Sequence, residues 1–284
     1  MTDAAPIILI GAARSGTKFL RDVLASAVGV KSVPYDVNYI WRHGSPNYGH
    51  DVLDPDTLTA KRSAYISESL FKLAKLGEKD TLVEKTVSNS LRVKFVNKVF
   101  PNARFVHIIR DGRDVAESAM RQWRAKPDLP ALLRKLGGVP LGSREYVYWF
   151  ARNFVSGLAK GRGGGKVWGP RFPGISFAVE NLSLAEVCAL QWRESVHSAQ
   201  FELSDVPNSE DRVFTIRYED LVKDELALNK LLEDLHLPDK DNVLRSYRVK
   251  RRPSVPEQWK LLPEVDQLMI SRIVETLDIT GNSV

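Results

Sequence analysis

The sequence predicts an α/β protein in which a central, mainly parallel sheet lies between two layers of helices. Short apolar runs occupy residues 6–10, 81–85, 104–110 and 212–218. Their hydrophobicity is continuous rather than alternating, as is typical of parallel strands covered on both faces. Helical patterns separate the runs, and such alternation builds right-handed β-α-β units. These observations predict a three-layer α/β/α domain.

A helix is expected after each predicted strand, because apolar residues recur there at spacings of three and four. The repeats are Phe19, Leu20, Val23, Leu24 and Ala27 after the first strand, Leu91, Phe95, Val96 and Val99 after the second, and Leu228, Leu231, Leu232 and Leu235 after the fourth. A helix containing Asp114 and Ser118 is predicted after the third strand, and residues 265–277 outline a terminal helix. In parallel sheets, ligands bind at the carboxyl ends of the strands.

Bulk composition limits the kind of protein this is. A chain of 284 residues with 43% hydrophobic content is long enough for one large core. Cys188 is its only cysteine, which excludes an intrachain disulfide framework, and it is expected in the core. We find no signal-peptide pattern and no apolar run of about 18 residues, so we expect a soluble, cytoplasmic protein. The formal charge of +6 favours anionic partners.

The stretch LIGAARSGTKF, residues 9–19, has the glycine spacing of a phosphate loop. A Walker loop reads G-x-x-x-x-G-K-[ST]; here Gly11 and Gly16 keep that spacing, but the next residues are Thr17 and Lys18 in the reverse order. The stretch follows a predicted strand and precedes a predicted helix. Backbone N–H groups and the helix dipole favour an anion in that position. The domain is therefore predicted to resemble P-loop NTPases and to bind phosphate.

The reversed order argues against a nucleotide triphosphatase. Such enzymes hold magnesium with a Ser or Thr after the Lys and with an aspartate at another strand end. Here Phe19 follows Lys18, and the third strand ends in Arg110. We therefore predict no metal but a second anion site, where Arg110 and Ser118 converge on one phosphate. The alternative is a structural ion pair between Arg110 and a nearby aspartate.

At this point the chain resembles a known family, the sulfotransferases that use 3'-phosphoadenosine-5'-phosphosulfate (PAPS). GAARSGTKFL is similar to their 5'-phosphosulfate loop, and RFVHIIRDGRDVAESAM is similar to their 3'-phosphate motif. Weaker similarity covers FTIRYEDLVKD, WRESV and SVPEQWKLL. The resemblance runs from residue 6 to about 278, apart from residues 30–80 and a Gly-rich loop. It implies transfer of a sulfuryl group to a hydroxyl or amine, with release of adenosine 3',5'-bisphosphate (PAP).

The resemblance also implies roles for the residues of the two motifs. Ser15, Gly16, Thr17 and Lys18 would cradle the 5'-phosphosulfate, and Arg110 and Ser118 would hold the 3'-phosphate. Arg14 would stabilise charge on the leaving oxygen. Since arginine stays protonated, Arg14 is not expected to act as a proton donor, unlike the Lys of many relatives.

For the base, the segment VEKT at residues 83–86 resembles the E-K-[ST] segment of glycan sulfotransferases. This resemblance implies Glu84 as base and Lys85 as its electrostatic partner. Two alternatives remain: Glu84 and Lys85 form a surface pair, or His43 or His50 is the base.

Two irregular segments are candidates for covering the site. The segment KRRPSVPEQWK (250–260) leaves Arg251 and Arg252 free to reach phosphate, or it is a solvated basic loop. The Gly-rich run 161–165 belongs to a longer stretch, 159–175, which we expect to be either a flexible connection or a lid.

We therefore expect residues 1–284 to form a single sulfotransferase-like domain, with 30–80 and 124–175 as acceptor-side helical or loop insertions. The expected cofactor is PAPS without a metal, and the expected partner is a small-molecule or glycan acceptor rather than nucleic acid or a membrane. The alternatives are a magnesium-dependent P-loop kinase of a small molecule and a non-catalytic nucleotide-binding protein. The sequence predicts neither the acceptor nor the oligomeric state.

Overall fold

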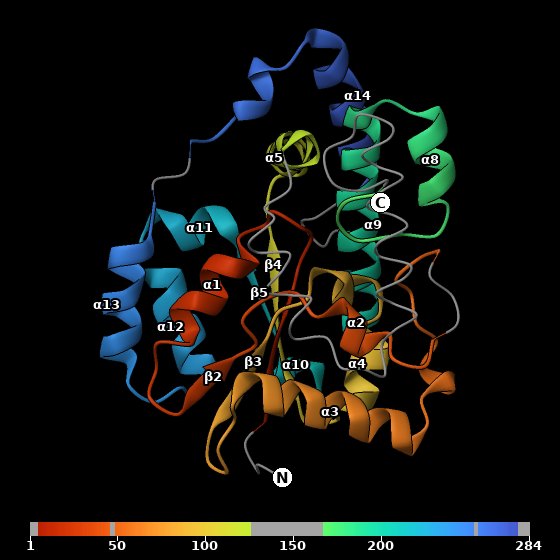
Figure 1. Ribbon diagram of the computed structural model, residues 1–284. Coiled ribbons are helices and arrows are strands. Elements are labelled where there is room, and N and C mark those ends of the chain that lie inside the picture. The colour runs from red at the N-terminus through yellow and green to blue at the C-terminus, as the bar shows by residue number, and fades with distance from the viewer. Residues whose placement is uncertain (1–4, 46–48, 126–166, 253–254, 278–284) are drawn as a thin grey trace.

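The computed structural model describes residues 5–45, 49–125, 167–252 and 255–277 (Figure 1). Its centre is a five-stranded sheet in the order β2-β3-β1-β4-β5, in which all neighbouring strands are parallel. The strands are β1 (Ile7–Ile10), β2 (Val30–Ser32), β3 (Thr81–Glu84), β4 (Arg104–Ile109) and β5 (Val213–Arg217). The four strands predicted from the sequence are confirmed, and the sheet is of the predicted kind.

β2 is the strand that the sequence reading missed. Its three residues, Val-Lys-Ser, lack an apolar run, and only Val30 is buried. The strand pairs with β3, with Val30 opposite Thr81 and Ser32 opposite Val83. Part of the segment 30–80, which we expected to be an insertion, is therefore the edge of the central sheet.

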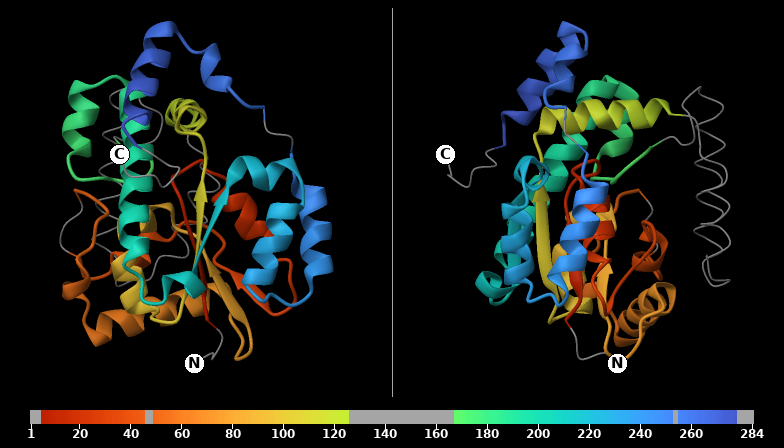
Figure 2. Two further views of the ribbon diagram at one scale, coloured as in Figure 1. Left: turned by 180° about the vertical axis from the view of Figure 1, so that it is seen from behind. Right: turned by 90° about the vertical axis from the view of Figure 1, so that its left-hand side faces the viewer.

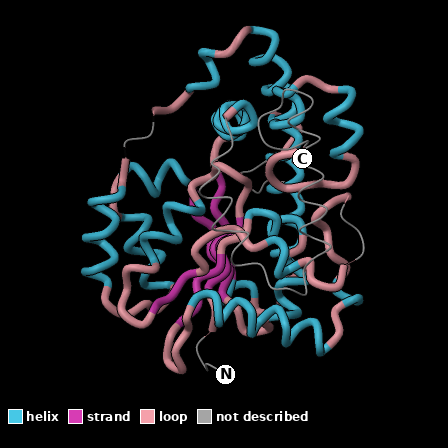
Figure 3. Tube along the Cα trace, in the orientation of Figure 1, coloured by secondary structure: helices cyan, strands magenta, loops and turns pink. Residues whose placement is uncertain are grey.

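Helices cover both faces of the sheet (Figures 1 and 3). One face carries α1 (Thr17–Leu24), α11 (Tyr218–Lys223), α12 (Leu226–Asp234) and α13 (Lys240–Lys250). The other carries α2 (Asn38–Trp41), α3 (Ala60–Ala74), α4 (Val93–Val99) and the lower part of α9 (Leu184–Ser204). Along β1, Ile7 and Leu9 pack into the first layer whereas Ile8 and Ile10 pack into the second. The predicted three-layer α/β/α architecture is confirmed.

A second group of helices lies beyond the carboxyl ends of the strands (Figure 2). It comprises α5 (Gly112–Arg124), α8 (Ile175–Asn181), the upper part of α9, and α14 (Glu264–Val274). Cys188 is buried in this group, as expected. The remaining short elements are α10 (Ser209–Arg212), η1 (Pro55–Thr57), η2 (Val87–Leu91) and η4 (Gln258–Leu261). None of the described helices has both the length and the apolar character needed to span a membrane.

Candidate active site

The loop between β1 and α1 has the tight geometry that its glycines predict. Gly16, with φ at +93°, and Arg14, with φ at +76°, both adopt left-handed backbone conformations. A Cβ atom at Gly16 would lie 2.3 Å from Cδ2 of Tyr218. Position 16 therefore requires glycine for two reasons, its backbone conformation and the close approach of Tyr218. Ser15 is fully buried, and its hydroxyl has no hydrogen-bond partner within the described chain.

The two predicted phosphate sites contact each other. Nε of Arg14 donates a hydrogen bond to Oγ of Ser118 at 3.0 Å, and Nη1 of Arg110 donates to the Arg14 carbonyl at 3.1 Å. The Arg110 guanidinium carbon also lies 4.6 Å from the ring centroid of Tyr218. The chain therefore brings together Arg14 from the loop, Arg110 from the end of β4 and Ser118 from α5.

The aspartates that follow Arg110 in the sequence, Asp111 and Asp114, contact other partners. The Asp111 carboxylate pairs with Arg113 at 2.6 Å and accepts the Arg113 backbone N–H at the start of α5. Asp114 accepts a hydrogen bond from the backbone N–H of Glu257 at 3.2 Å. The alternative in which Arg110 pairs with one of these aspartates therefore does not match the observed contacts.

Two other cations lie near Arg14. Partial burial lowers the pKa of Arg14 below its ordinary value, the cations Arg121 and Arg110 lower that pKa further, and the anion Glu117 opposes them. Such a shift means that the charged form lacks stabilisation, which a bound anion would supply. Lys18, which is exposed at the start of α1, adds another positive charge nearby.

A cleft of about 580 Å³ opens over these residues. Its lining includes Arg14, Gly16, Thr17, Lys18 and Arg110 among the predicted cofactor-binding residues, and Lys85 among the predicted catalytic residues. The other lining residues are Ala13, Phe19, Asp22, Asp36, Val87, Trp168, Tyr218 and Lys250. The predicted residues Ser15 and Ser118 are buried at its border and do not line it.

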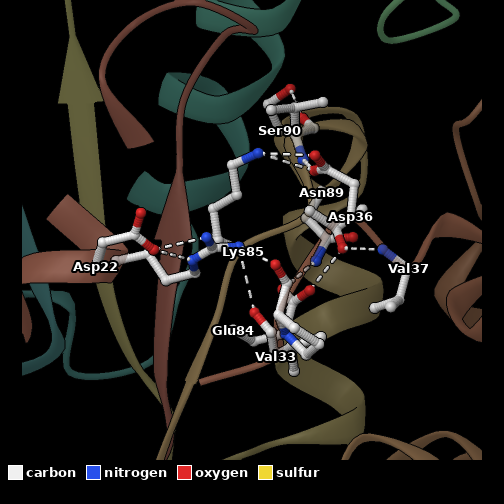
Figure 4. A network of polar contacts seen from close by, with 12 residues as sticks. Asp22, Val33, Asp36, Val37, Glu84, Lys85, Asn89 and Ser90 are labelled. Carbon is white, nitrogen blue, oxygen red and sulfur yellow. Dashed lines mark hydrogen bonds and ion pairs between the residues drawn. The ribbon is translucent and has the colours of Figure 1, made fainter. Parts of the chain in front are cut away.

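Lys85 and Asp36 form an ion pair within this lining. Nζ of Lys85 lies 2.8 Å from Oδ2 and 3.0 Å from Oδ1 of Asp36, and the Val87 backbone N–H donates to Oδ1 at 2.9 Å. Figure 4 shows the Lys85 side chain extending to the Asp36 carboxylate. The Asp36 side chain is 36% exposed and that of Lys85 9%. A carboxylate and an ammonium group are therefore held together in the cleft, and the carboxylate remains accessible.

Glu84, predicted as the base, lies outside the cleft lining. Its side chain is fully buried and accepts hydrogen bonds from Trp41 Nε1 at 3.3 Å, Thr86 Oγ1 at 2.6 Å and Asn89 Nδ2 at 2.9 Å. Burial raises the pKa of this carboxyl group above its ordinary value, although the donors from Thr86 and Trp41 oppose that change. Neighbouring residues at a strand end point to opposite faces of the sheet. The strand therefore brings Lys85 to the cleft but not Glu84.

The two histidines considered as alternative bases also lie outside the cleft lining. The His43 ring stacks on Tyr65 with 3.6 Å between centroids, and burial together with the cations Arg62 and Lys61 lowers the pKa of His43. The His50 carbonyl accepts a hydrogen bond from Nη1 of Arg42. The geometry therefore gives neither histidine a place next to Lys85.

In the basic segment after α13, Arg251 and Arg252 are exposed, which agrees with the alternative of a solvated basic loop. Nη1 of Arg251 donates to the Lys223 carbonyl at 3.0 Å, and neither Arg251 nor Arg252 lines the cleft. Because α13 continues to Lys250, that residue reaches the cleft instead, and its Nζ donates to the Asp22 carbonyl at 2.7 Å. The Gly-rich run 161–165 lies outside the described residues.

Sequence reasoning missed two central residues of the cleft. Tyr218 directly follows β5, as Arg110 follows β4, so the rule that ligands bind at strand ends pointed to it. Asp36 follows β2 by four residues, but β2 itself was not predicted. No local pattern in the sequence identified Asp36.

Comparisons with known proteins concern a part of the sequence and the fold. Residues 51–152, which include Lys85, Arg110 and Ser118, match the model of the sulfotransferase family. A search of curated proteins found no match.

Solved structures with similar folds include sulfotransferase STF9 from Mycobacterium avium, with 14% identity and a TM-score of 0.54, covering 98% of this chain and 78% of that one. Mouse sulfotransferase SULT7A1, solved in complex with PAP, has 15% identity and a TM-score of 0.51, with 99% and 87% covered. Sulfotransferase STF1 from Mycobacterium tuberculosis has 12% identity and a TM-score of 0.51, with 96% and 77% covered. At these identities the structural likeness concerns the fold.

Proposed function

We propose that the chain transfers a sulfuryl group from PAPS to a hydroxyl group of a carbohydrate or similar acceptor, since residues 51–152 match the sulfotransferase family model and the fold is similar to those of solved sulfotransferases. The observation that carries this proposal is the direct contact between the two anion sites, from Arg14 to Ser118 and from Arg110 to the Arg14 carbonyl. A nucleotide with phosphates at both the 5' and the 3' positions is a ligand that needs two such sites side by side.

Residues on one side of the cleft fit such a nucleotide; we call Arg14, Gly16, Thr17, Lys18, Arg110 and Tyr218 the donor half. The buried Ser15 hydroxyl without a partner and the lowered pKa of Arg14 support an anion in this half. The loop residues Arg14 to Lys18 would hold the 5'-phosphosulfate, and Arg110 with Ser118 would hold the 3'-phosphate. When bound, PAPS would supply the sulfuryl group, and PAP would be released.

We call Asp22, Asp36, Lys85, Val87 and Trp168 the acceptor half. A base must reach the proton of the attacking hydroxyl. Asp36 lines the cleft and is partly exposed, whereas Glu84 is enclosed by three hydrogen-bond donors. We therefore propose Asp36 as the base and Lys85 as the cation that stabilises developing negative charge. For Glu84 we propose a supporting role at the end of β3, in place of the catalytic role that the sequence suggested.

The acceptor half also favours a particular class of acceptor. Trp168 lines the cleft together with the carboxylates of Asp22 and Asp36. An indole ring offers an apolar face to a sugar ring, and carboxylates accept hydrogen bonds from sugar hydroxyls. These features support a carbohydrate or another polyhydroxylated acceptor.

We also propose that residues 1–284 act as one domain. Among the described residues, the strands and the helices that cover them come from segments between Ile7 and Lys250, and the cleft takes its lining from segments between Ala13 and Lys250. Both the sheet and the cleft therefore depend on segments that are far apart in the described chain.

The test is a transfer assay with labelled PAPS and a panel of mono- and oligosaccharides, in which PAP release is also measured. We expect labelled product from the parent protein and a loss of about 100-fold or more in kcat for Lys85→Met. Lys98→Met is the matched control, because Lys98 pairs with Asp56 at 3.2 Å and lies outside the cleft lining. It should retain the parent's activity.

Two outcomes would contradict the proposal. A parent protein that binds PAP tightly but transfers nothing across the panel would favour the non-catalytic reading. Magnesium-dependent phosphate transfer from ATP to the same panel would favour the kinase.

A further inference from the structure

Arg110 is the cation at the centre of the donor half, and its direction is set by the backbone that carries it. The peptide between Arg110 and Asp111 joins the end of β4 to the start of α5. Two side chains from other parts of the chain bind this one peptide. Neither is among the residues considered above as ligands of a phosphate group.

The first is Trp192, in the middle of α9. Its indole Nε1 donates a hydrogen bond to the Arg110 carbonyl at 3.1 Å, and only 1% of the residue is exposed. α9 is a rigid support, since its 21 residues begin with a complete capping box formed by Ser183 and Glu186. Trp192 is absent from the cleft lining, so it reaches the carbonyl from behind the site.

The second is Glu219, in the first turn of α11. Its Oε1 accepts a hydrogen bond from the backbone N–H of Asp111 at 3.0 Å. The Arg110 carbonyl and the Asp111 N–H are the two polar ends of one planar peptide unit. Because Trp192 binds one end and Glu219 the other, the plane of this peptide is fixed, and with it the direction in which the Arg110 side chain leaves the backbone.

Packing adds to the hydrogen bonds. A Cβ atom at Gly112 would lie 2.7 Å from Cδ2 and Cε3 of Trp192, so the indole lies directly against the backbone of the turn. Trp192 also packs in one apolar cluster with Ala12 of the phosphate loop and Val115 of α5. One side chain therefore contacts both segments that form the donor half.

Resting on the proposed function, we propose that Trp192 and Glu219 are positioning residues for Arg110. They set how strongly the protein prefers a nucleotide that carries a 3'-phosphate over one that does not. Loss of either contact frees the peptide to rotate and turns Arg110 away from the 3'-phosphate, while the loop that binds the 5'-phosphate stays in place.

The experiment compares the Kd of PAP with the Kd of adenosine 5'-phosphate by titration calorimetry. The two ligands differ in the 3'-phosphate alone. The Kd of adenosine 5'-phosphate divided by the Kd of PAP therefore measures how much the 3'-phosphate adds to binding. Trp192→Phe and Glu219→Ala should lower this ratio about tenfold, since the charge-assisted contact between Arg110 and the 3'-phosphate is lost. The Kd of adenosine 5'-phosphate should stay within about twofold of the parent value.

Two matched controls separate positioning from general destabilisation. Trp123 is also buried, and its Nε1 donates to Gln191 beside Trp192, so Trp123→Phe removes the same kind of bond without touching Arg110. Glu219→Gln keeps an acceptor oxygen for the Asp111 N–H. Both variants should keep the parent's ratio.

The outcomes are distinct. If Trp192→Phe weakens both nucleotides equally, or leaves the ratio unchanged, the positioning role is overturned. If Trp192→Phe does not fold, Glu219→Ala and Glu219→Gln decide the question in the same way. A parent protein that binds PAP no better than adenosine 5'-phosphate would overturn the proposed function itself, before any variant is made.

Discussion

The two halves of the cleft are built in different ways. In the donor half, Arg14, Gly16 and Arg110 lie on two strand-to-helix turns, and Thr17, Lys18 and Tyr218 lie in the first turns of the helices that follow strands β1 and β5. In the acceptor half, Asp36, Lys85 and Trp168 come from three distant segments, and the central contact is a side-chain ion pair. The donor half is held mainly by backbone geometry and the acceptor half by long-range side-chain contacts.

This difference predicts different sensitivities. Substitutions in the donor half should act through backbone strain and loss of nucleotide affinity, whereas those in the acceptor half should act on turnover. Four predictions test this contrast, from the largest expected effect to the smallest.

Asp36→Asn should lower kcat by about 10²- to 10⁴-fold, because an amide cannot accept the proton of the acceptor hydroxyl. The Kd of PAP should change by less than about threefold, since Asp36 belongs to the acceptor half. Asp56→Asn is the control: the Asp56 carboxylate pairs with Lys98 at 3.2 Å and lies outside the cleft lining, so turnover should be nearly unchanged. Full turnover of the Asp36→Asn variant would show that Asp36 is not the base.

The core beneath the donor half should be sensitive to acid through His107 in β4. Burial lowers the pKa of His107 from 6.5 to about 4. Between pH 6.5 and pH 4, His107 binds a proton in the unfolded chain but not in the folded protein. The contribution of neutral His107 to the free energy of unfolding is therefore fully present above pH 6.5 and is lost as the pH falls to 4. The loss should reach about 3 kcal/mol in the free energy of unfolding.

Urea unfolding between pH 4 and pH 7 measures this slope. His107→Phe should remove most of it, whereas His197→Gln, at an exposed position on α9, should retain it. An identical slope in parent and His107→Phe would show that other groups cause the acid sensitivity.

Gly16→Ala should weaken PAP binding about a hundredfold. The backbone at Gly16 has φ at +93°, and the new Cβ would lie 2.3 Å from the Tyr218 ring, so strain and overlap each cost about 1 to 3 kcal/mol. Gly174→Ala is the matched control, because Gly174 has φ at +90° but nothing within 4 Å of the new Cβ. Calorimetry should find PAP affinity unchanged in that control; equal losses in both variants would point to a global effect.

Glu84→Gln should lower the free energy of unfolding by about 1 to 3 kcal/mol. The carboxylate of Glu84 accepts three hydrogen bonds, and the amide nitrogen of Gln, which cannot accept, would face at least one of these donors. Urea unfolding measures the change. Turnover of the folded fraction should fall by less than about tenfold. A loss of 100-fold or more at unchanged stability would return Glu84 to the role of base.

The same contrast explains how much could be predicted from the sequence. The spacing of Gly11 and Gly16 and the position of Arg110 are local patterns, so the strand-to-helix turns of the donor half were predictable. The meeting of Asp36 with Lys85 depends on β2, whose Val-Lys-Ser sequence gives no apolar run. The resemblance alone suggested Glu84 as the base. Because side chains alternate at the end of β3, the Glu84 side chain is buried in the core.

The most direct test of the account is calorimetric titration of the parent protein with PAP and, separately, with ATP and magnesium. The two contacting anion sites predict that PAP binds with a Kd at least about tenfold lower than that of ATP with magnesium, and that Arg110→Ala removes most of this preference. Binding of ATP with magnesium that equals or exceeds that of PAP would contradict the account.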